Sequence, residues 1–424
     1  MAGPATYFDP ARSGELDPAT RALVARRERV LGSAYRLFYD EPLQLVRGLG
    51  TTVWDAEGTE YLDAYNNVPS VGHAHPRVVA AIADQAATLN THTRYLQEGI
   101  LDYAEQVLET MPAELSTMMF TCTGSEANDL ALRIAKHVTG GTGVVVTSNA
   151  YHGVTTEIAA ISPSLGGLES LADWVRVVDP SDLASVGAAF DELRASGVRP
   201  AAFIVDTILA SDGVIPAIDG LADAVAATRE RGALFIADEV QPGYGRLGHG
   251  MWGFDRYGLS PDLVTVGKPM ANGHPVAAVM SRRDYTEQFG RSVRYFNTFG
   301  GNTVSVAAAQ ATLDVLREEG LIENSRVIGE RLLRDLRAID SSLVTDVRGA
   351  GLFIGVTLER DGRPATAETL AVVNELRRRR VLLAASGVDN NILKIRPPLP
   401  FDARDADRLV TELAAALALQ GGMA

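Results

Sequence analysis

The chain of 424 residues has a single cysteine, Cys122. An intramolecular disulfide is therefore excluded, and the cysteine count says nothing about secretion. Basic residues are also in deficit, because 39 lysines and arginines face 53 acidic residues, for a formal net charge of −14. Such a chain lacks the basic surface that nucleic acids and anionic membranes require. We therefore expect no nucleic-acid partner and no membrane association, and a few local cations must hold any anionic substrate.

Long apolar runs are missing as well. No stretch approaches the ~18 consecutive apolar residues of a membrane span. The first 17 residues contain three acidic residues and no apolar core of a signal peptide. A cytoplasmic location is thus the default expectation. Metal ligands are scarce too, since no cysteine or carboxylate completes a ligand set around His73 and His75, and we predict no metal site.

Apolar residues are plentiful at 46%, with 22% charged, which is typical of a soluble enzyme with a large core. The middle of the chain alternates short β-branched runs with amphipathic helical segments, such as 126–137 and 221–231. This alternation predicts a mostly parallel sheet with crossover helices. The predicted strands are 117–121, 143–148, 174–178, 201–206, 234–238 and 263–266.

Both ends of the chain differ from the middle. Residues 1–30 read as a loosely packed arm that ends in a helix. From about residue 306 the pattern is rich in helices and poor in strands, which predicts a second, smaller domain. Its expected elements are a long helical stretch to residue 336, a strand over 351–358, and helices over 366–379 and 403–419.

Two predicted strands end in residues that carry chemistry. Asp238 closes the apolar run 234–237, and Lys268 follows the strand 263–266 after Gly267. Ligands bind at the carboxyl ends of strands in open α/β sheets. A carboxylate and an amine at one sheet edge are what pyridoxal-phosphate (PLP) chemistry needs. The lysine forms a Schiff base and later shuttles protons, and the carboxylate keeps the pyridine nitrogen protonated.

A turn between a strand and a helix, at 121–126, is the third part of this constellation. Thr123 and Glu126 have the spacing of a capping box, which fixes the helix start. The N–H groups of Gly124 and Ser125 and the Ser125 hydroxyl then form an anion site at the positive end of the helix dipole. Beside Asp238 and Lys268, we interpret this turn as the seat of the PLP phosphate.

These motifs together resemble the class III aminotransferase family, from about residue 40 to the end. The signature runs from 236–241 (Ile-Ala-Asp-Glu-Val-Gln) through Gly243 and Gly245 to 262–268 (Asp-Leu-Val-Thr-Val-Gly-Lys). Further blocks agree in order at 72–76, 124–128, 151–153 and 297–302. The resemblance implies the α/β fold of PLP fold type I, with a seven-stranded-type sheet in the large domain and a smaller α+β domain. It divides the chain into an arm with part of the small domain (1–60), a large PLP-binding domain (61–305) and a C-terminal small domain (306–424).

The same resemblance implies roles for four further side chains. Tyr151 would stack on the pyridine ring, Val240 would pack on the other face, and Gln241 would approach the ring oxygen. The threonine that matches Thr298 reaches the PLP phosphate of the neighbouring subunit in this family. A homodimer with composite active sites is therefore implied.

The family motifs leave two reactions open. One is transfer of an amino group to an oxo acid by an ω-aminotransferase. The other, which we favour, is elimination of phosphate and ammonia from a small phosphorylated primary amine such as phosphoethanolamine. Many class III members grip carboxylates with an arginine that is paired with a glutamate; here Lys394 and Ser211 stand at those positions. A lysine is a compact point charge that suits a phosphate.

A further segment resembles the ethanolamine-phosphate phospholyase branch of the family. It comprises residues 90–96, together with 66–68 and the block around Lys394. Arg94 could join Lys394 in a phosphate-recognition cluster, with Arg77 as a weaker candidate. For Arg94, a helix cap or a subunit contact is the slightly better-supported alternative.

Overall fold

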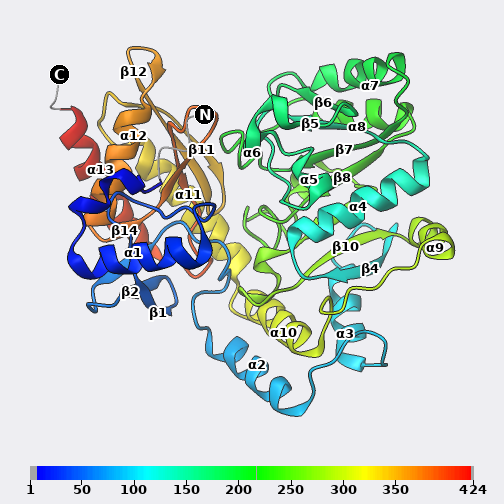
Figure 1. Cartoon of the computed structure of the whole chain (residues 1–424), viewed down its shortest axis with the longest axis horizontal. Coiled ribbons are helices and arrows are strands. Elements are labelled where there is room, and N and C mark those ends of the chain that lie inside the picture. Colours follow the sequence, from blue (N-terminus) through cyan, green and yellow to red (C-terminus); the bar gives the residue numbers. More distant parts are fainter. Residues whose placement is uncertain (1–6, 216, 422–424) are drawn as a thin grey trace.

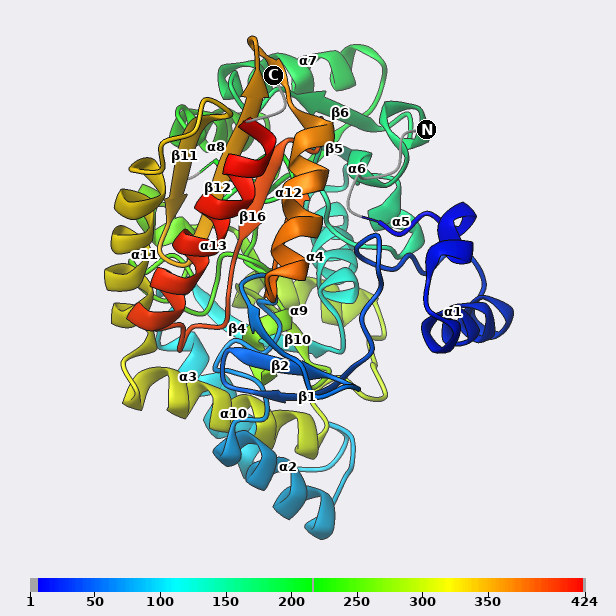
Figure 2. The same cartoon turned by 90° about the vertical axis from the view of Figure 1, so that its left-hand side faces the viewer.

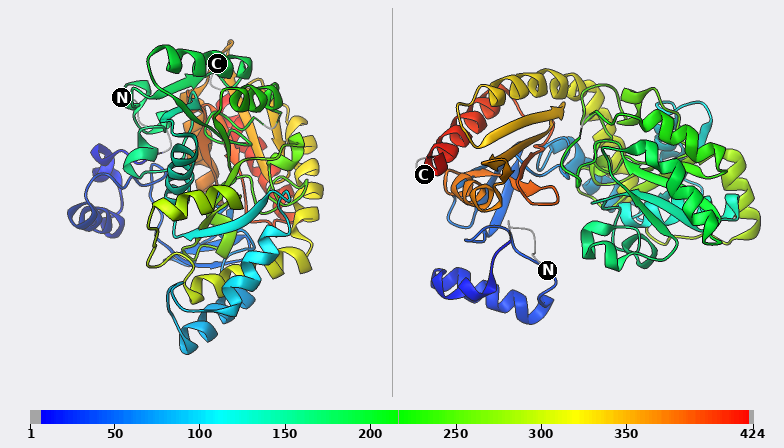
Figure 3. Two further views of the ribbon diagram at one scale, coloured as in Figure 1. Left: turned by 90° about the vertical axis from the view of Figure 1, so that its right-hand side faces the viewer. Right: turned by 90° about the horizontal axis from the view of Figure 1, so that it is seen from above.

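The computed structural model describes residues 7–215 and 217–421. Figure 1 shows two bodies side by side, each built around its own β-sheet structure. Seen from above in Figure 3, the large sheet and its helices form one lobe, and helices α11 (Leu321–Arg337) and α13 (Ala403–Gly421) border the other. Nowhere in the described ranges is a helix both long enough and apolar enough to cross a bilayer.

The larger body contains a seven-stranded sheet, and all six predicted strands belong to it. Its strands are, in spatial order, β4 (Leu115–Thr121), β10 (Ala277–Arg282), β9 (Leu263–Val266), β8 (Leu234–Asp238), β7 (Pro200–Asp206), β5 (Gly143–Thr147) and β6 (Val175–Val178). β10 pairs antiparallel with both β4 and β9, whereas the pairs from β9 to β6 are parallel. The expectation of a mostly parallel sheet is confirmed. β10 was not predicted, because its alanines have low strand propensity and burial on both faces removes the alternating pattern.

Alternate residues of each strand pack into layers on the two faces of this sheet. On β7, Ala202 and Ile204 pack with the buried face of α4 (Gly124–Thr139), while Phe203 and Val205 pack on the opposite side. α7 (Val186–Ala195) and α8 (Leu221–Glu230) cover that opposite face. The remaining helices of this body are α5 (Thr156–Ala159), α6 (Pro163–Gly166) and α9 (Arg283–Ser292). The sheet is thus covered on both faces, and a ligand can reach it at the ends of its strands.

The smaller body combines both ends of the chain. β14 (Val381–Leu382) pairs parallel with β3 (Glu60–Asp63), so one sheet has the order β1 (Leu45–Leu49), β2 (Thr52–Asp55), β3, β14. A second sheet has the order β11 (Val344–Ala350), β12 (Phe353–Arg360), β16 (Ile392–Ile395), β15 (Ala384–Ser386), with β13 (Arg363–Pro364) on β12. Figure 2 shows α12 (Thr366–Arg378) and α13 side by side on this body. The domain boundaries at residues 60 and 305 stay a prediction.

The expectation that the C-terminal tail has few strands is wrong. Six of the strands named above, β11 to β16, lie between residues 344 and 395. Four of them are four residues long or shorter. β14 pairs with β3, more than 300 residues away, and β16 pairs with β12, whereas β13 and β15 pair with the strands next to them in the chain. The predicted long helical stretch is also two helices, α10 (Thr303–Glu318) and α11, because Gly320 adopts the left-handed conformation between them.

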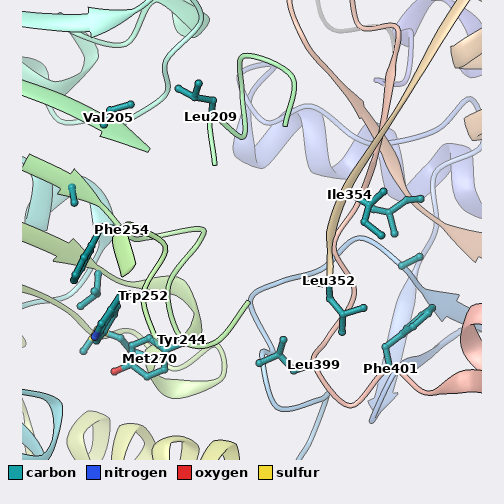
Figure 4. Close-up of a cluster of buried hydrophobic side chains, with 14 of the residues drawn as sticks. Val205, Leu209, Tyr244, Trp252, Phe254, Met270, Leu352, Ile354, Leu399 and Phe401 are labelled. Atoms are coloured by element: carbon teal, nitrogen blue, oxygen red, sulfur yellow. The ribbon is translucent and has the colours of Figure 1, made fainter. Parts of the chain in front are cut away.

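Helices and a continuous apolar core join the two bodies. α2 (Pro76–Thr88) and α3 (Glu98–Leu108) lie against α10 below the large sheet (Figure 1). In Figure 4, Tyr244, Trp252 and Phe254 lie on the large-sheet side, and Leu352 and Phe401 on the other side. The arm forms η1 (Pro10–Glu15) and α1 (Pro18–Leu31), which extend to one side of the molecule in Figure 2. The two bodies therefore share one hydrophobic core.

We predict that Phe203→Ala lowers stability strongly. Phe203 is fully buried, and its ring centroid lies 6.1 Å from that of Phe235 on the neighbouring strand. Truncating a buried phenylalanine leaves a cavity and costs about 3–5 kcal/mol of unfolding free energy. Urea unfolding measures this loss. Leu168→Ala, at an exposed position, is the matched control and should change the midpoint little; equal shifts for the two variants would contradict the packing described here.

Candidate active site

A cavity of about 320 Å³ lies at the carboxyl ends of β7 and β8 and the start of α4. Seven of the predicted site residues line it, namely Gly124, Ser125, Tyr151, Asp238, Val240, Gln241 and Lys268. The parallel register of the strands explains why these residues lie close together. Asp206 is opposite Asp238, and Asp238 is opposite Thr265, three residues before Lys268. Residues 144 positions apart along the chain, Gly124 and Lys268, thus share one wall because their strands lie in one sheet.

Asp238 is buried, and both of its carboxylate oxygens have hydrogen-bond partners in the protein. Its Oδ2 accepts a hydrogen bond from Asn128 Nδ2 at 2.9 Å and lies 2.7 Å from His152 Nδ1. Its Oδ1 accepts from the backbone N–H of Val240 at 3.1 Å. Because a carboxylate oxygen accepts, the hydrogen in the His152 contact belongs on Nδ1. These contacts compensate the burial of the carboxylate and fix its direction.

Asn128 and His152 were not predicted as site residues, although both stand in motif blocks. Asn128 lies one turn after Gly124 on α4; its Nδ2 also donates to the His152 carbonyl oxygen at 2.7 Å. Its Oδ1 accepts from Thr265 Oγ1 at 2.6 Å. One amide therefore connects β8, β9 and the segment after β5. The signal in the sequence was a buried polar residue on the apolar face of a helix, which needs a partner.

Lys268 begins the short helix η5 (Lys268–Ala271) directly after β9 and Gly267. Within the described part of the chain its ammonium makes no hydrogen bond or ion pair, and the side chain lines the cavity. Burial, and secondarily the charge of Arg396, lower the pKa of Lys268 to about 8, against the opposing effect of Asp238 and Asp206. The free amine is thus accessible close to neutral pH, as a nucleophilic lysine requires.

The start of α4 has the predicted capping geometry. Thr123 caps the helix, its hydroxyl accepts from the Glu126 N–H, and the Glu126 carboxylate accepts from the Thr123 N–H at 3.0 Å, so the capping box is confirmed. The Ser125 hydroxyl accepts from the Val154 N–H at 3.1 Å. A Cβ at Gly124 would lie 3.0 Å from the Val240 side chain, so glycine allows this close approach. The helix N-terminus is open toward the cavity and favours an anion.

The cavity therefore offers the groups that PLP requires. An amine, a buried carboxylate, an anion-binding helix start and an aromatic ring line one space. The Asp238 carboxylate lines this space and is held by hydrogen bonds from the protein, which suits an interaction with a protonated ring nitrogen. The residues fit the cofactor.

The substrate-side candidates lie apart from one another. Lys394 on β16 is buried, and its Nζ donates to the Ala210 carbonyl oxygen at 2.7 Å. Arg77 is exposed and pairs with Glu318 at 2.6 Å, and Arg94 lies at the surface with its Cζ 3.7 Å from the Phe296 ring centroid. The described chain therefore does not gather Arg77, Arg94 and Lys394 into one cluster. Thr298 is exposed and lies outside the cavity of its own chain.

Asp206 is a partly buried acid opposite Asp238 in the sheet. It lines the cavity, and its carboxylate accepts from the N–H groups of Ile208 and Ala210 at 3.1 and 3.0 Å. Burial and the nearby Asp238 charge raise the pKa of Asp206 to about 6. Burial lowers the pKa of Lys394, and the Arg396 charge adds to this, whereas Asp206 opposes it. The acid thus partly balances the two cations of the small body.

Fold and site together define the class of this protein. The model of the family described as Aminotransferase class-III matches residues 38–417, and the chain belongs to that family. Its fold is PLP fold type I, and it is a PLP-dependent enzyme.

Similar proteins carry the names of both aminotransferases and phospholyases, as three of them show. The chain is 38% identical over 416 residues to "Alanine--glyoxylate aminotransferase 2-like" of Drosophila melanogaster, covering 91% of this chain and 84% of that protein. It is 37% identical over 457 residues to "Ethanolamine-phosphate phospho-lyase homolog 1" of Caenorhabditis elegans, covering 98% and 97%. A solved phospholyase from Arthrobacter in complex with phosphoethanolamine superposes with a TM-score of 0.91 at 41% identity, covering 93% of this chain and 99% of that one.

We predict that Gly153→Ala weakens cofactor binding by at least ~10-fold, since a displaced Ser125 loses one or more charge-assisted hydrogen bonds to the cofactor phosphate. Gly153 has φ +135°, and an added Cβ would lie 2.4 Å from Ser125 Oγ and 2.7 Å from Ser125 Cα. The methyl group must push Ser125 out of the anion site. Gly167→Ala is the control, because Gly167 also has a positive φ but meets no atom within 4 Å. The PLP dissociation constant of each refolded or purified variant measures the effect, and equal constants would contradict it.

Proposed function

We propose that this enzyme is a phospholyase that acts on a small O-phosphorylated primary amine such as phosphoethanolamine. The overall reaction takes up one water and releases acetaldehyde, ammonia and inorganic phosphate. The observation that carries the proposal is the likeness, over nearly the whole chain, to a phospholyase whose solved structure contains phosphoethanolamine. The lysine at position 394 and the serine at 211, in place of the arginine and glutamate found in many family members, support it.

We assign the cofactor contacts to this chain's residues as follows. Gly124 and Ser125 bind the phosphate, Tyr151 and Val240 enclose the ring, and Gln241 reaches the ring oxygen. Bound PLP supplies an electron-accepting ring that stabilises negative charge at the carbon next to the amine. Asp238 holds the proton on the pyridine nitrogen, and Asn128 and His152 hold Asp238 in place.

Lys268 performs the proton transfer in this proposal. As a free amine it removes the proton from the carbon that bears the substrate amine. The bond between the next carbon and the phosphate oxygen then breaks, and the electron pair leaves with the phosphate. Charge accumulates on the leaving group, so a cation beside it stabilises the transition state more than the ground state.

Lys394 is the proposed cation for the leaving phosphate. In the structure its ammonium is bound to the Ala210 carbonyl oxygen. Ser386 Oγ also donates to this oxygen, at 3.0 Å, so the carbonyl keeps a partner if Lys394 turns to a ligand. An entering phosphate would thus replace a neutral carbonyl oxygen as the partner of Lys394. Lys394 would gain a charge-assisted hydrogen bond at small cost.

We further propose a homodimer in which Thr298 completes the partner's site. Thr298 is exposed, and the adjoining Phe299 is 69% exposed. Tyr95 and Leu96 on the segment after α2 are also exposed, at 64% and 97%. Apolar side chains so exposed mark a surface for a partner.

The alternative is an ω-aminotransferase that delivers the amino group to an oxo acid such as pyruvate or 2-oxoglutarate. Its support is the comparable similarity to a protein named as an aminotransferase. The cofactor contacts assigned above serve this reaction equally well.

Product analysis separates the two reactions. We predict that the purified, PLP-loaded enzyme releases equimolar phosphate, ammonia and acetaldehyde from phosphoethanolamine without any oxo acid. Its visible absorption should persist through turnover, and Lys268→Ala should abolish product formation. Loss of the visible absorption with an amine donor alone, recovery on adding an oxo acid, and no phosphate release would instead establish the aminotransferase.

We also predict that Lys394→Ala lowers turnover on phosphoethanolamine by roughly 10²-fold, the range for loss of one preorganised electrostatic partner. Lys394→Arg keeps the charge and should recover part of the rate. Ser386→Ala is the matched control, because it removes another donor to the same Ala210 oxygen without removing a charge. Steady-state kinetics with each variant measure the effect; equal losses for Lys394→Ala and Ser386→Ala would reject the role of the cation.

A further inference from the structure

Arg396 is a buried arginine beside the active site that the sequence analysis did not single out. It follows β16 and has 9% of its surface exposed. One guanidinium nitrogen, Nη1, donates to Gln241 Oε1, and the guanidinium carbon lies 4.4 Å from the Tyr65 ring centroid. Its Nε is buried and has no hydrogen-bond partner within the described residues. A buried charge with an unpaired N–H group is costly, which indicates a role other than stability.

The contact with Gln241 fixes the orientation of an amide. A guanidinium has N–H donors and no acceptor, so the Gln241 atom that faces Arg396 must be the oxygen. The amide nitrogen is then the Gln241 group that remains available to the cavity, which Gln241 lines. Without a donor-only neighbour, both orientations of the amide would be available. Arg396 therefore turns Gln241 into a hydrogen-bond donor toward the cavity.

Arg396 is also a charged neighbour of Lys268, because its guanidinium contacts Gln241, which lines the same cavity as Lys268. The charged groups near Lys268 are Arg396 and Lys394 from the small body and Asp206 and Asp238 from the large body. Titratable neighbours along the cavity wall are Cys122, Tyr151, His152 and His274. Burial is the larger cause of the lowered pKa of Lys268, and Arg396 is the second. Both acids oppose it.

We propose that Arg396 is a positioning residue of the cofactor pocket, which orients Gln241 as a donor and places a positive charge beside Lys268. The proposal goes beyond the choice of reaction, because a phospholyase and an aminotransferase need the same donor and the same amine. It rests on the cofactor placement proposed above.

The first test measures the pH at which Lys268 becomes reactive. Cofactor-free protein is mixed with PLP over about three pH units around neutrality, reduced with borohydride, and the modified Lys268 peptide is quantified by mass spectrometry. A nearby positive charge favours the neutral amine, so Arg396→Gln and Arg396→Met should move the midpoint upward by about half a unit or more. Arg396→Lys keeps the charge and should retain the wild-type midpoint.

Two outcomes of this experiment have distinct meanings. An unchanged midpoint in whichever neutral variant folds, judged by thermal unfolding, overturns the action of Arg396 on Lys268. Lys268→Ala should show no labelled peptide at this position. If the wild-type label were found on another lysine, the proposed cofactor placement would fail and not the role of Arg396.

The second test is a double-mutant cycle in the Lys268→Ala background. No covalent link forms there, so only the non-covalent affinity of the pocket for PLP is measured. Gln241→Leu removes the donor and should raise the PLP dissociation constant by about 2- to 10-fold, the worth of one hydrogen bond. Arg396→Met should cause a similar loss. Because Arg396 acts through Gln241, the double variant should bind no more weakly than Gln241→Leu alone. Losses that multiply in the double variant overturn the orienting role.

Discussion

A carboxylate buried at the carboxyl end of β8 must be satisfied from within the protein, and the contacts of Asp238 set the rest of the site. Asn128 from α4, His152 from the segment after β5 and the Val240 N–H converge on it. Asn128 can do so because Thr265 on β9 donates to its other end. The start of α4, the segment that carries Tyr151 and the strand before Lys268 are thereby held to one another by a single hydrogen-bonded group.

The cavity is lined by residues between 68 and 276, and the small body contacts it through Arg396, which donates to Gln241. Asp206, Asp238 and Lys268 come from the large sheet, whereas Lys394 and Arg396 come from β16 and its end in the small body. The loop after β7 lies between them, and the small body holds it by its carbonyl oxygens: Lys394 and Ser386 donate to Ala210, and Arg348 donates to Gly213 and Val214. Leu209 and Val214 of this loop have positive φ angles of 48° and 62°, which are strained for such residues. Packing between the bodies therefore maintains a conformation that the loop alone would not favour.

Charge at the site runs opposite to charge on the whole chain. The net charge is −14, yet three cations (Lys268, Lys394 and Arg396) and two acids (Asp206 and Asp238) interact at or beside the cavity. Burial and mutual repulsion lower the pKa values of Lys268 and Lys394, and the pKa of Asp206 is raised. A small anionic ligand would relieve this crowding of cations. Local placement, and not the global field, thus decides what the cavity attracts.

By itself the sequence determined where six of the seven central strands lie along the chain, the start of α4 at Gly124 and the positions of Asp238 and Lys268 at strand ends. Each depends on local signals, namely apolar runs, a capping box and the polar residue that ends a strand. Only the tertiary structure decided that β10 runs antiparallel between β4 and β9, and that the tail forms one sheet of its own and adds β14 to the sheet of β1, β2 and β3. It also decided that Arg77 pairs with Glu318 at the surface while Arg396, without a local signal, lies on Gln241. A long cation finds its partner through packing between segments more than 100 residues apart, and no short pattern along the chain encodes that choice.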